Sequence, residues 1–105
     1  MQVGVADRSV VQTSDDETRC LSPLRLQEKI DDLVRLVSSG RAFARPSGTE
    51  DVVRVYAEAA SQEQADWLAG AVAEAIFDEA GGVGTRPQSV GAAPPESNEH
   101  KKLKM

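Results

Sequence analysis

The organisation of this chain follows from one segment, Arg41-Ala-Phe-Ala-Arg-Pro-Ser-Gly-Thr-Glu-Asp-Val-Val-Arg-Val-Tyr-Ala-Glu-Ala59. Residues 41–45 predict a short strand. Residues 52–59 alternate with a period of two, which is typical of a strand with one buried face. That face is expected to carry Val53, Val55, Ala57 and Ala59. Between the two strands lies a polar loop, residues 46–51, so the segment predicts a hairpin.

The loop offers backbone and hydroxyl groups that suit an anion. Pro46 fixes its own φ, and Gly48 permits a positive φ and a close approach of a ligand to the backbone. Ser47 and Thr49 add hydroxyl groups beside free backbone N–H groups, and such groups together can form an anion-binding nest. The loop composition therefore favours a phosphate site.

Two arginines flank this loop. Arg45 enters it and Arg54 lies early on the returning strand, so both guanidinium groups could face one hollow. Planar guanidinium groups pair with phosphate oxygens through two N–H donors at once. The alternative interpretation is a plain hairpin with two surface arginines, because Ser, Gly and Thr are ordinary turn residues.

One sequence motif resembles the phosphate-binding loop in the last domain of the α-D-phosphohexomutases. It is Arg45-Pro-Ser-Gly-Thr-Glu-Asp-Val-Val-Arg-Val-Tyr-Ala-Glu-Ala59. Glu50-Asp-Val-Val53 is similar to the acetylglucosamine branch of that superfamily in particular. The resemblance covers Gln2 to about Pro87, which is one domain. It implies that substrate phosphate is bound by Arg45, Pro46, Ser47, Gly48, Thr49 and Arg54.

The resemblance also implies a reaction. The family interconverts sugar 1- and 6-phosphates through a bisphosphorylated intermediate on a phosphoserine enzyme. For the acetylglucosamine branch this means an isomerase that converts N-acetylglucosamine 6-phosphate to the 1-phosphate on the route to UDP-N-acetylglucosamine. Mg²⁺ is implied for the complete enzyme, and the substrate partner would be a phosphorylated amino sugar.

The family's other loops are missing from this sequence. There is no phosphoserine loop, no metal loop and no sugar-recognition loop, all of which belong to three earlier domains. The chain is therefore expected to hold no catalytic residue, metal or cofactor of its own. Three hypotheses stay open: a mutase fragment that is inactive without the missing domains, a free-standing phosphosugar- or phosphate-binding module, and a non-functional remnant.

Charge and composition narrow the class of partner. Among 105 residues the net charge is −5, with eight Lys and Arg against fifteen Asp and Glu in residues 1–83. An acidic body argues against nucleic acid or an anionic membrane as a partner. No apolar run approaches the roughly 18 residues that would span a bilayer. Cys20 is the single cysteine, which favours a reducing, cytoplasmic location without an intrachain disulfide.

The remaining segments predict two helices and a first hairpin. Residues 2–6 and 9–13 are expected to pair as strands. Ser22-Pro23 and the apolar stripe that follows predict a helix over residues 22–39, with Gly40 in a left-handed capping conformation. Asp31 and Arg35 have the spacing of a helical ion pair. The pattern Ser61-x-x-Gln64 is a capping box and predicts a second helix over residues 61–80.

These elements give the order ββαββα and an α+β fold. The expected arrangement is a four-stranded antiparallel sheet with two helices on one face, since both helices have one apolar stripe to bury. The resemblance implies the same fold, which is TATA-box-binding-protein-like. The domain is expected to occupy residues 1–83, and the polar, unpatterned residues 84–105 are expected to form a disordered tail. The acidic cluster at residues 15–17 is interpreted as solvated charge rather than a metal site.

Overall fold

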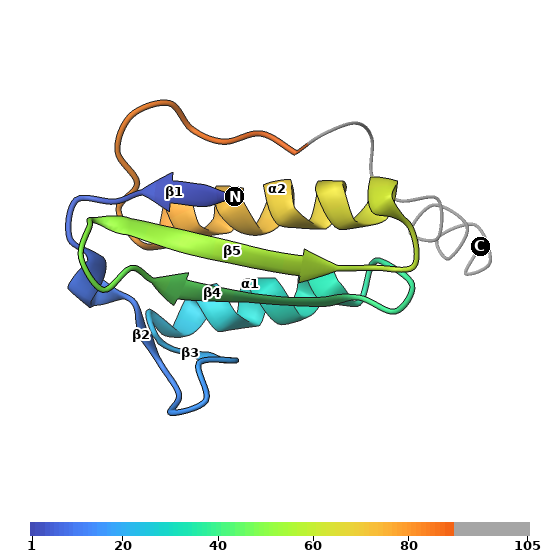
Figure 1. Cartoon of the computed structure of the whole chain (residues 1–105), viewed down its shortest axis with the longest axis horizontal. Helices are drawn as coiled ribbons and strands as arrows, with labels where there is room; N and C mark the ends of the chain where they lie inside the picture. The colour runs from blue at the N-terminus through green and yellow to red at the C-terminus, as the bar shows by residue number, and fades with distance from the viewer. Residues whose placement is uncertain (90–105) are drawn as a thin grey trace.

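The structure is a computed structural model, and it describes residues 1–89 of the chain. Two α-helices, one 3₁₀ turn and five short or medium strands follow one another in this part (Figure 1). Their bounds are β1 Gln2–Gly4, η1 Arg8–Val10, β2 Gln12–Thr13, β3 Cys20–Ser22, α1 Leu24–Val34, β4 Arg41–Pro46, β5 Val52–Glu58 and α2 Gln62–Glu79.

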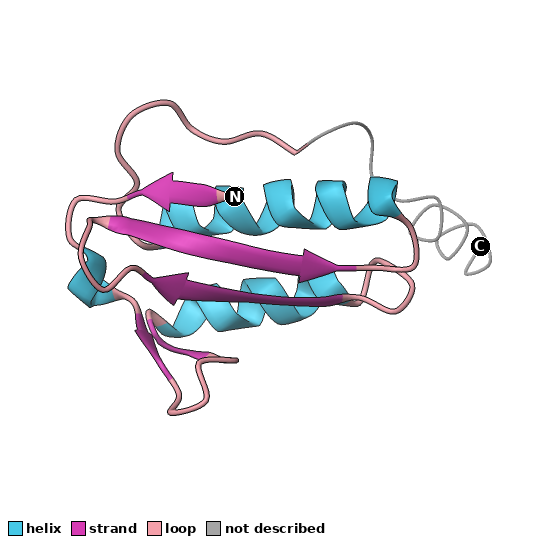
Figure 2. Cartoon of the chain, viewed as in Figure 1, coloured by secondary structure: helices cyan, strands magenta, loops and turns pink. Residues whose placement is uncertain are grey.

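The strands form a main sheet with both helices behind it. The main sheet has three strands in the order β1-β5-β4, with antiparallel pairing throughout, and β2 and β3 form a separate pair. Figure 2 shows α1 and α2 side by side on one face of the main sheet. The α+β class and the two helices on one face are confirmed. The prediction of four strands in one sheet is wrong, because the described strands divide three and two.

The expected pairing of residues 2–6 with 9–13 is also wrong. Strand β1 pairs with β5, with Val3 opposite Val53. The chain then turns away at η1, where Asp7 accepts a hydrogen bond from the backbone N–H of Ser9 at 2.9 Å. Strand β2 finds its partner in β3, a strand that the sequence pattern did not predict. The first strand is therefore used to extend the central hairpin.

The helix over residues 61–80 is present as predicted, and Ser61 Oγ accepts from the backbone N–H of Gln64 at 3.2 Å. The first helix is shorter than its predicted 22–39. It begins after Pro23 without a side-chain cap and ends at Val34. The left-handed conformation expected at Gly40 falls on Ser39 instead, at a φ of 54°.

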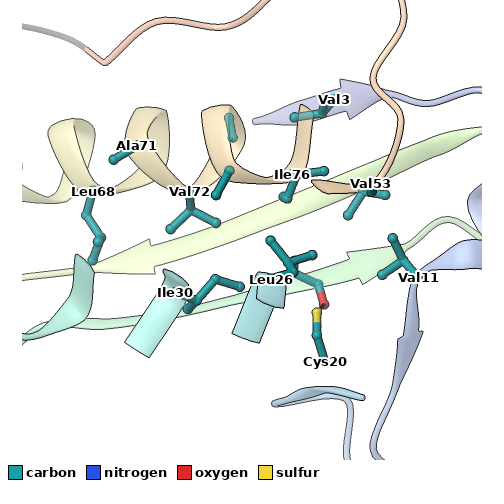
Figure 3. Close-up of a cluster of buried hydrophobic side chains, with 14 of the residues drawn as sticks. Val3, Val11, Cys20, Leu26, Ile30, Val53, Leu68, Ala71, Val72 and Ile76 are labelled. Atoms are coloured by element: carbon teal, nitrogen blue, oxygen red, sulfur yellow. Dashed lines mark hydrogen bonds between the residues drawn. The ribbon is translucent and has the colours of Figure 1, made fainter. Parts of the chain in front are cut away.

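The core lies between the helices and the main sheet. Figure 3 shows apolar side chains from both layers converging there. The largest fully buried ones are Leu26, Ile30, Leu68, Ile76, Val53 and Val72. On β5 the predicted alternation holds: Val53 is fully buried, whereas Arg54 and Tyr56 are exposed. The helices thus cover one face of the hairpin and leave the other face open.

Beyond α2, the described chain runs on to residue 89. In this part Arg86 forms an ion pair with Asp78 at 2.7 Å. The expected tail begins at residue 84, so its first six residues are described and its larger part, residues 90–105, lies outside the described residues. The predicted domain boundary stays a prediction.

Candidate functional site

The two arginines of the motif lie directly opposite each other. In the antiparallel register of β4 and β5, Arg45 pairs with Arg54. Their neighbours Ala44 and Val53 point into the core, so both arginines lie on the open face. Directly opposed residues have Cβ atoms about 5 Å apart. The side chains of Arg45 and Arg54 therefore start side by side on the open face of the sheet.

Both arginines line one hollow of about 220 Å³. The other lining residues are Phe43, Val55 and Tyr56. The rings of Phe43 and Tyr56 stack with centroids 4.8 Å apart, and the guanidinium carbon of Arg45 lies 5.2 Å from the Phe43 centroid. This is a cation–π contact. Phe43 thus lies between the Arg45 guanidinium and the Tyr56 ring, which explains why it is buried although it faces outward.

Carboxylates stand near this hollow as well. Glu17, from the turn between β2 and β3, approaches Arg45 at 4.0 Å. The hydroxyl of Tyr56 donates to Glu58, and that hydrogen bond raises the pKa of Tyr56. Glu58 also approaches Arg41 at 3.8 Å. The positive charge of the hollow therefore comes from Arg45 and Arg54, with acidic groups at its margins.

In the loop between the two arginines, the Ser47 hydroxyl forms hydrogen bonds with the loop backbone. Ser47 is buried, and its Oγ accepts from the backbone N–H groups of Thr49 and Glu50, each at 3.2 Å. The backbone N–H of Ser47 donates to Val52 O at 2.9 Å. The expectation of free loop N–H groups is therefore wrong for Thr49 and Glu50. A hydroxyl whose lone pairs accept two hydrogen bonds keeps its own O–H as a donor.

Gly48 lies at the exposed tip of the loop. It does not adopt a positive φ, in contrast to Gly81 at 74°, so the conformational reason expected for glycine here does not hold. A Cβ built at Gly48 would find no atom within 4 Å. The backbone is therefore open to an approaching group on this side.

The predicted site residues come from one hairpin but do not line one hollow. Pro46 and Ser47 line a second hollow, of about 480 Å³, together with residues of the 3₁₀ turn. Gly48 and Thr49 are exposed at the loop tip. The loop thus lies between two hollows, and Arg45 and Arg54 belong to the first.

Arg8 contacts the same loop, and the sequence pattern did not single it out. Its guanidinium donates to Asp51 Oδ1 at 3.3 Å and to Gly48 O at 3.4 Å. Asp7-Arg8 is typical of a turn, and a separation of 43 residues from Asp51 leaves no local signal for the contact. The residue could be found only once the fold was known.

The candidate site lies in a part of the chain that is similar to a known protein family. Residues 8–75 match the family model of the phosphoglucomutase/phosphomannomutase C-terminal domain. The chain belongs to this family. The match includes the whole arginine-flanked hairpin, so the candidate site lies within the family domain.

Relatives place this phosphohexomutase C-terminal domain in one branch. Phosphoacetylglucosamine mutase of Sus scrofa is 60% identical over 88 residues, which are 84% of this chain and 16% of the relative. The Homo sapiens protein of that name is 59% identical over the same share. The resemblance to the acetylglucosamine branch is confirmed. The chain spans only about 16% of the length of these relatives.

Solved structures agree with this placement. N-acetylphosphoglucosamine mutase of Aspergillus fumigatus, in complex with GlcNAc-6P and magnesium, is 52% identical with a TM-score of 0.74. The match covers 76% of this chain and 15% of that chain. A substrate complex of N-acetylglucosamine-phosphate mutase, a member of the α-D-phosphohexomutase superfamily, is 45% identical with a TM-score of 0.69 over 72% of this chain and 14% of that chain. The fold of this domain is thus the fold of those domains.

The described part of this phosphohexomutase domain does not fit a magnesium ion. No group of three His, Cys, Asp or Glu side chains in residues 1–89 is arranged to hold a metal. In the acidic cluster, the Asp16 carboxylate instead accepts hydrogen bonds from the hydroxyls of Ser14 and Thr18, each at 2.8 Å. These hydrogen bonds lower the pKa of Asp16, and the bond from Ser14 has the largest effect. Asp16 therefore organises its own turn.

Two further findings concern the rest of the described chain. No helix in residues 1–89 is long and apolar enough to cross a bilayer. The Cys20 thiol is buried and donates to Ala44 O at 3.8 Å, and burial raises its pKa to about 11. A thiol with such a pKa is almost fully protonated at neutral pH and is a poor nucleophile.

Proposed function

We propose that this domain binds the phosphate of a phosphorylated amino sugar in a phosphoacetylglucosamine mutase, which converts N-acetylglucosamine 6-phosphate to the 1-phosphate. The observation that carries the proposal is the cross-strand pair of Arg45 and Arg54 over one hollow, beside a hydroxyl-bearing loop. The GlcNAc-6P in the Aspergillus fumigatus complex supports the substrate class.

The chemistry assigns a role to each residue. Arg45 and Arg54 neutralise the phosphate dianion with charge-assisted hydrogen bonds. From the loop between the two hollows, Ser47 donates its O–H to a phosphate oxygen, since its acceptor positions are occupied by the N–H groups of Thr49 and Glu50. Gly48 lets the phosphate reach the backbone, and Pro46 fixes the entry of the loop. In this role Ser47 is a phosphate ligand and not a nucleophile.

A clamp of this kind suits a mutase. The enzyme must hold one phosphate while the other end of the sugar reacts, and it must then hold the turned intermediate. A site that recognises only the phosphate serves both orientations. In phosphoryl transfer, positioning and charge neutralisation supply most of the catalysis. The reacting serine and the Mg²⁺ would belong to other domains of the mutase. Those domains are the partners that this proposal requires, and the location that we propose for the enzyme is the cytoplasm.

Binding to the isolated chain is expected to be weak. One face of the site would be missing, and the acidic body repels anions. We expect a dissociation constant of about 1 mM for N-acetylglucosamine 6-phosphate, which corresponds to about −4 kcal/mol. Inorganic phosphate should compete and N-acetylglucosamine should not, because the bound group is the phosphate.

Chemical-shift titration of the 105-residue chain tests the clamp. Amides of residues 47–49 should shift on addition of N-acetylglucosamine 6-phosphate. Arg45→Ala and Arg54→Ala should each abolish detectable binding, and Arg→Lys at either position should recover little, because an ammonium group cannot replace the two-pronged contact. Arg25→Ala is the matched control, since Arg25 is an exposed arginine on α1 whose side chain is 77% accessible. Shifts confined to another surface, or unchanged binding by both variants, would disprove the clamp.

A further inference from the structure

One side chain outside the hairpin holds two points of the phosphate loop. Arg8 reaches the loop return through Asp51 Oδ1, which accepts from the Arg8 backbone N–H at 3.1 Å and from its Nη1 at 3.3 Å. Its Nη2 donates to Gly48 O at the loop tip, at 3.4 Å. A single guanidinium therefore spans the tip and the return of the loop, a task that suits its rigid planar fork.

The position of Arg8 is itself well determined. It begins η1, a turn capped by Asp7, whose carboxylate accepts from the N–H and the hydroxyl of Ser9. The turn is followed by Val11, which is buried in the core and donates its N–H to Arg8 O at 3.1 Å. Arg8 thus extends from an anchored backbone toward the loop.

The loop has few other ties to the rest of the molecule. Its internal hydrogen bonds run from the backbone N–H groups of Thr49 and Glu50 to Ser47 Oγ, and from the backbone N–H of Val52 to Glu50 O at 2.8 Å. Among the hydrogen bonds that the described residues form, Asp51 O also accepts from the backbone N–H of Val5 at 3.0 Å. At Gly48, open space surrounds the chain where a side chain would stand. The contact from Arg8 therefore supplies an external hold at the exposed tip.

We propose that Arg8 is a positioning residue that fixes the phosphate loop in its binding geometry through Asp51 and Gly48. The proposal rests on the proposed function, in which this loop meets the phosphate. A loop that is ordered before binding loses less conformational entropy when the ligand arrives, so affinity rises without a direct contact. Arg8 then acts on binding through the loop rather than by touching the phosphate.

A simpler electrostatic role makes the opposite predictions. If Arg8 only attracted the anion, then Arg8→Lys would preserve binding, and Asp51→Asn would strengthen it by removing a negative charge. If Arg8 positions the loop, both changes weaken the bridge, because Lys lacks the planar fork that reaches two acceptors and Asn lacks the charge that strengthens the contact. Arg8→Lys, Arg8→Gln and Asp51→Asn should then each weaken the binding of phosphate about fivefold, in line with the loss of one or two hydrogen bonds. The double variant Arg8→Gln/Asp51→Asn should bind about as well as Arg8→Gln alone, because Arg8→Gln already removes the guanidinium contact with Asp51 together with the contact with Gly48 O.

The experiment combines two readouts on the 105-residue chain. The first is the dissociation constant for inorganic phosphate and for N-acetylglucosamine 6-phosphate, from chemical-shift titration. The second is the backbone order parameter of residues 48–51 without ligand, which should fall from near 0.85 to below about 0.6 in the Arg8 variants. Arg25→Gln is the control for loss of one arginine, and the order parameters of α2 control for general destabilisation.

The outcomes separate this proposal from the function on which it rests. Weaker binding together with a loosened loop supports positioning. The positioning role is overturned if the Arg8→Lys variant binds phosphate as well as the wild type, or if the Asp51→Asn variant binds it more tightly. Either result would mean that Arg8 only attracts the anion. If the wild-type chain binds no phosphate at this loop, the proposed function fails. The order parameters then still decide whether Arg8 holds the loop, and values unchanged from the Arg25→Gln control would overturn that too.

Discussion

At single residues, the surroundings set what each group of the candidate site can do. Arg45 and Arg54 face one hollow because the hairpin register places them opposite each other. Ser47 accepts two loop N–H groups, which leaves its hydroxyl as a donor. Two glycines also differ in their surroundings: a Cβ at Gly48 would meet no atom within 4 Å, whereas a Cβ at Gly40 would lie 2.4 Å from Val37 Cγ2.

This contrast predicts opposite behaviour of two identical substitutions. Gly40→Ala should lower the free energy of unfolding by about 1–3 kcal/mol, because the new methyl group collides with packed atoms. Gly48→Ala should change it by less than about 0.5 kcal/mol, since no atom lies within 4 Å of the added methyl group. Chemical denaturation measures both. Gly48→Ala should nevertheless weaken phosphate binding in the titration described above, because its methyl group stands where the ligand approaches. Equal stability of the two variants would contradict the packing of Gly40.

At the level of elements, the small hairpin of β2 and β3 is tied to α1 by polar contacts. The backbone N–H of Cys20 donates to Gln27 Oε1 at 2.6 Å, and Gln27 Nε2 donates to Asp31 at 2.9 Å. Arg19 donates to the same carboxylate at 3.0 Å. The predicted ion pair between Asp31 and Arg35 does not form. Arg35 instead forms an ion pair with Asp32, and Asp31 forms one with Arg19. Asp31 thus joins the hairpin to the helix.

This network predicts a pH dependence. Partial burial acts to raise the pKa of Asp31, but the hydrogen bonds from Gln27 and Arg19 outweigh it and the net pKa is lowered. A carboxyl group whose pKa is lower in the folded state contributes stability above its unfolded value of about 3.9, and this contribution is lost as the pH falls through the folded value. The difference in unfolding free energy between wild type and Asp31→Asn should therefore be largest at neutral pH and shrink below about pH 4. Thermal or chemical unfolding from pH 7 to pH 2 measures it, and a difference that grows in acid would contradict the assignment.

On the scale of the whole molecule, the domain is a small acidic body with one open sheet face. It spans about 16% of its phosphoacetylglucosamine mutase relatives. Its described residues offer no metal cluster, and its one cysteine is a buried thiol of raised pKa. The clamp that we propose would hold a substrate, while the reacting groups come from elsewhere.

The purified 105-residue chain is therefore expected to show no mutase activity with N-acetylglucosamine 6-phosphate, even with magnesium and a bisphosphate activator. A chimera of the Aspergillus fumigatus enzyme that carries this chain in place of its own C-terminal domain should be active, and Arg45→Ala in that chimera should reduce kcat/KM. A coupled assay for the 1-phosphate measures both. Turnover by the isolated chain would contradict the proposal. Tight binding by the isolated chain together with an inactive chimera would favour a free-standing binding module, and neither activity nor binding would indicate a remnant.

Local signals in the sequence determined much of this protein. The alternation of residues 52–59, the capping box at Ser61 and the apolar stripe of the first helix each act within a few residues, so they predicted the hairpin and both helices. The motif from Arg45 to Arg54 pointed to the family, which the comparisons confirm. Short-range geometry carries this information because hydrogen bonds and steric limits along the backbone repeat with a known period.

Only the tertiary structure decided how distant segments meet. It placed β1 beside β5, paired β2 with β3, and brought Arg8 to Asp51, 43 residues further along the chain, in the loop of the central hairpin. Strands of two or three residues are too short to show a period, and their pairing depends on which neighbours bury them. Contacts of this kind are set by the packing free energy of the whole domain, because the entropy of closing a long loop is repaid only when the core forms.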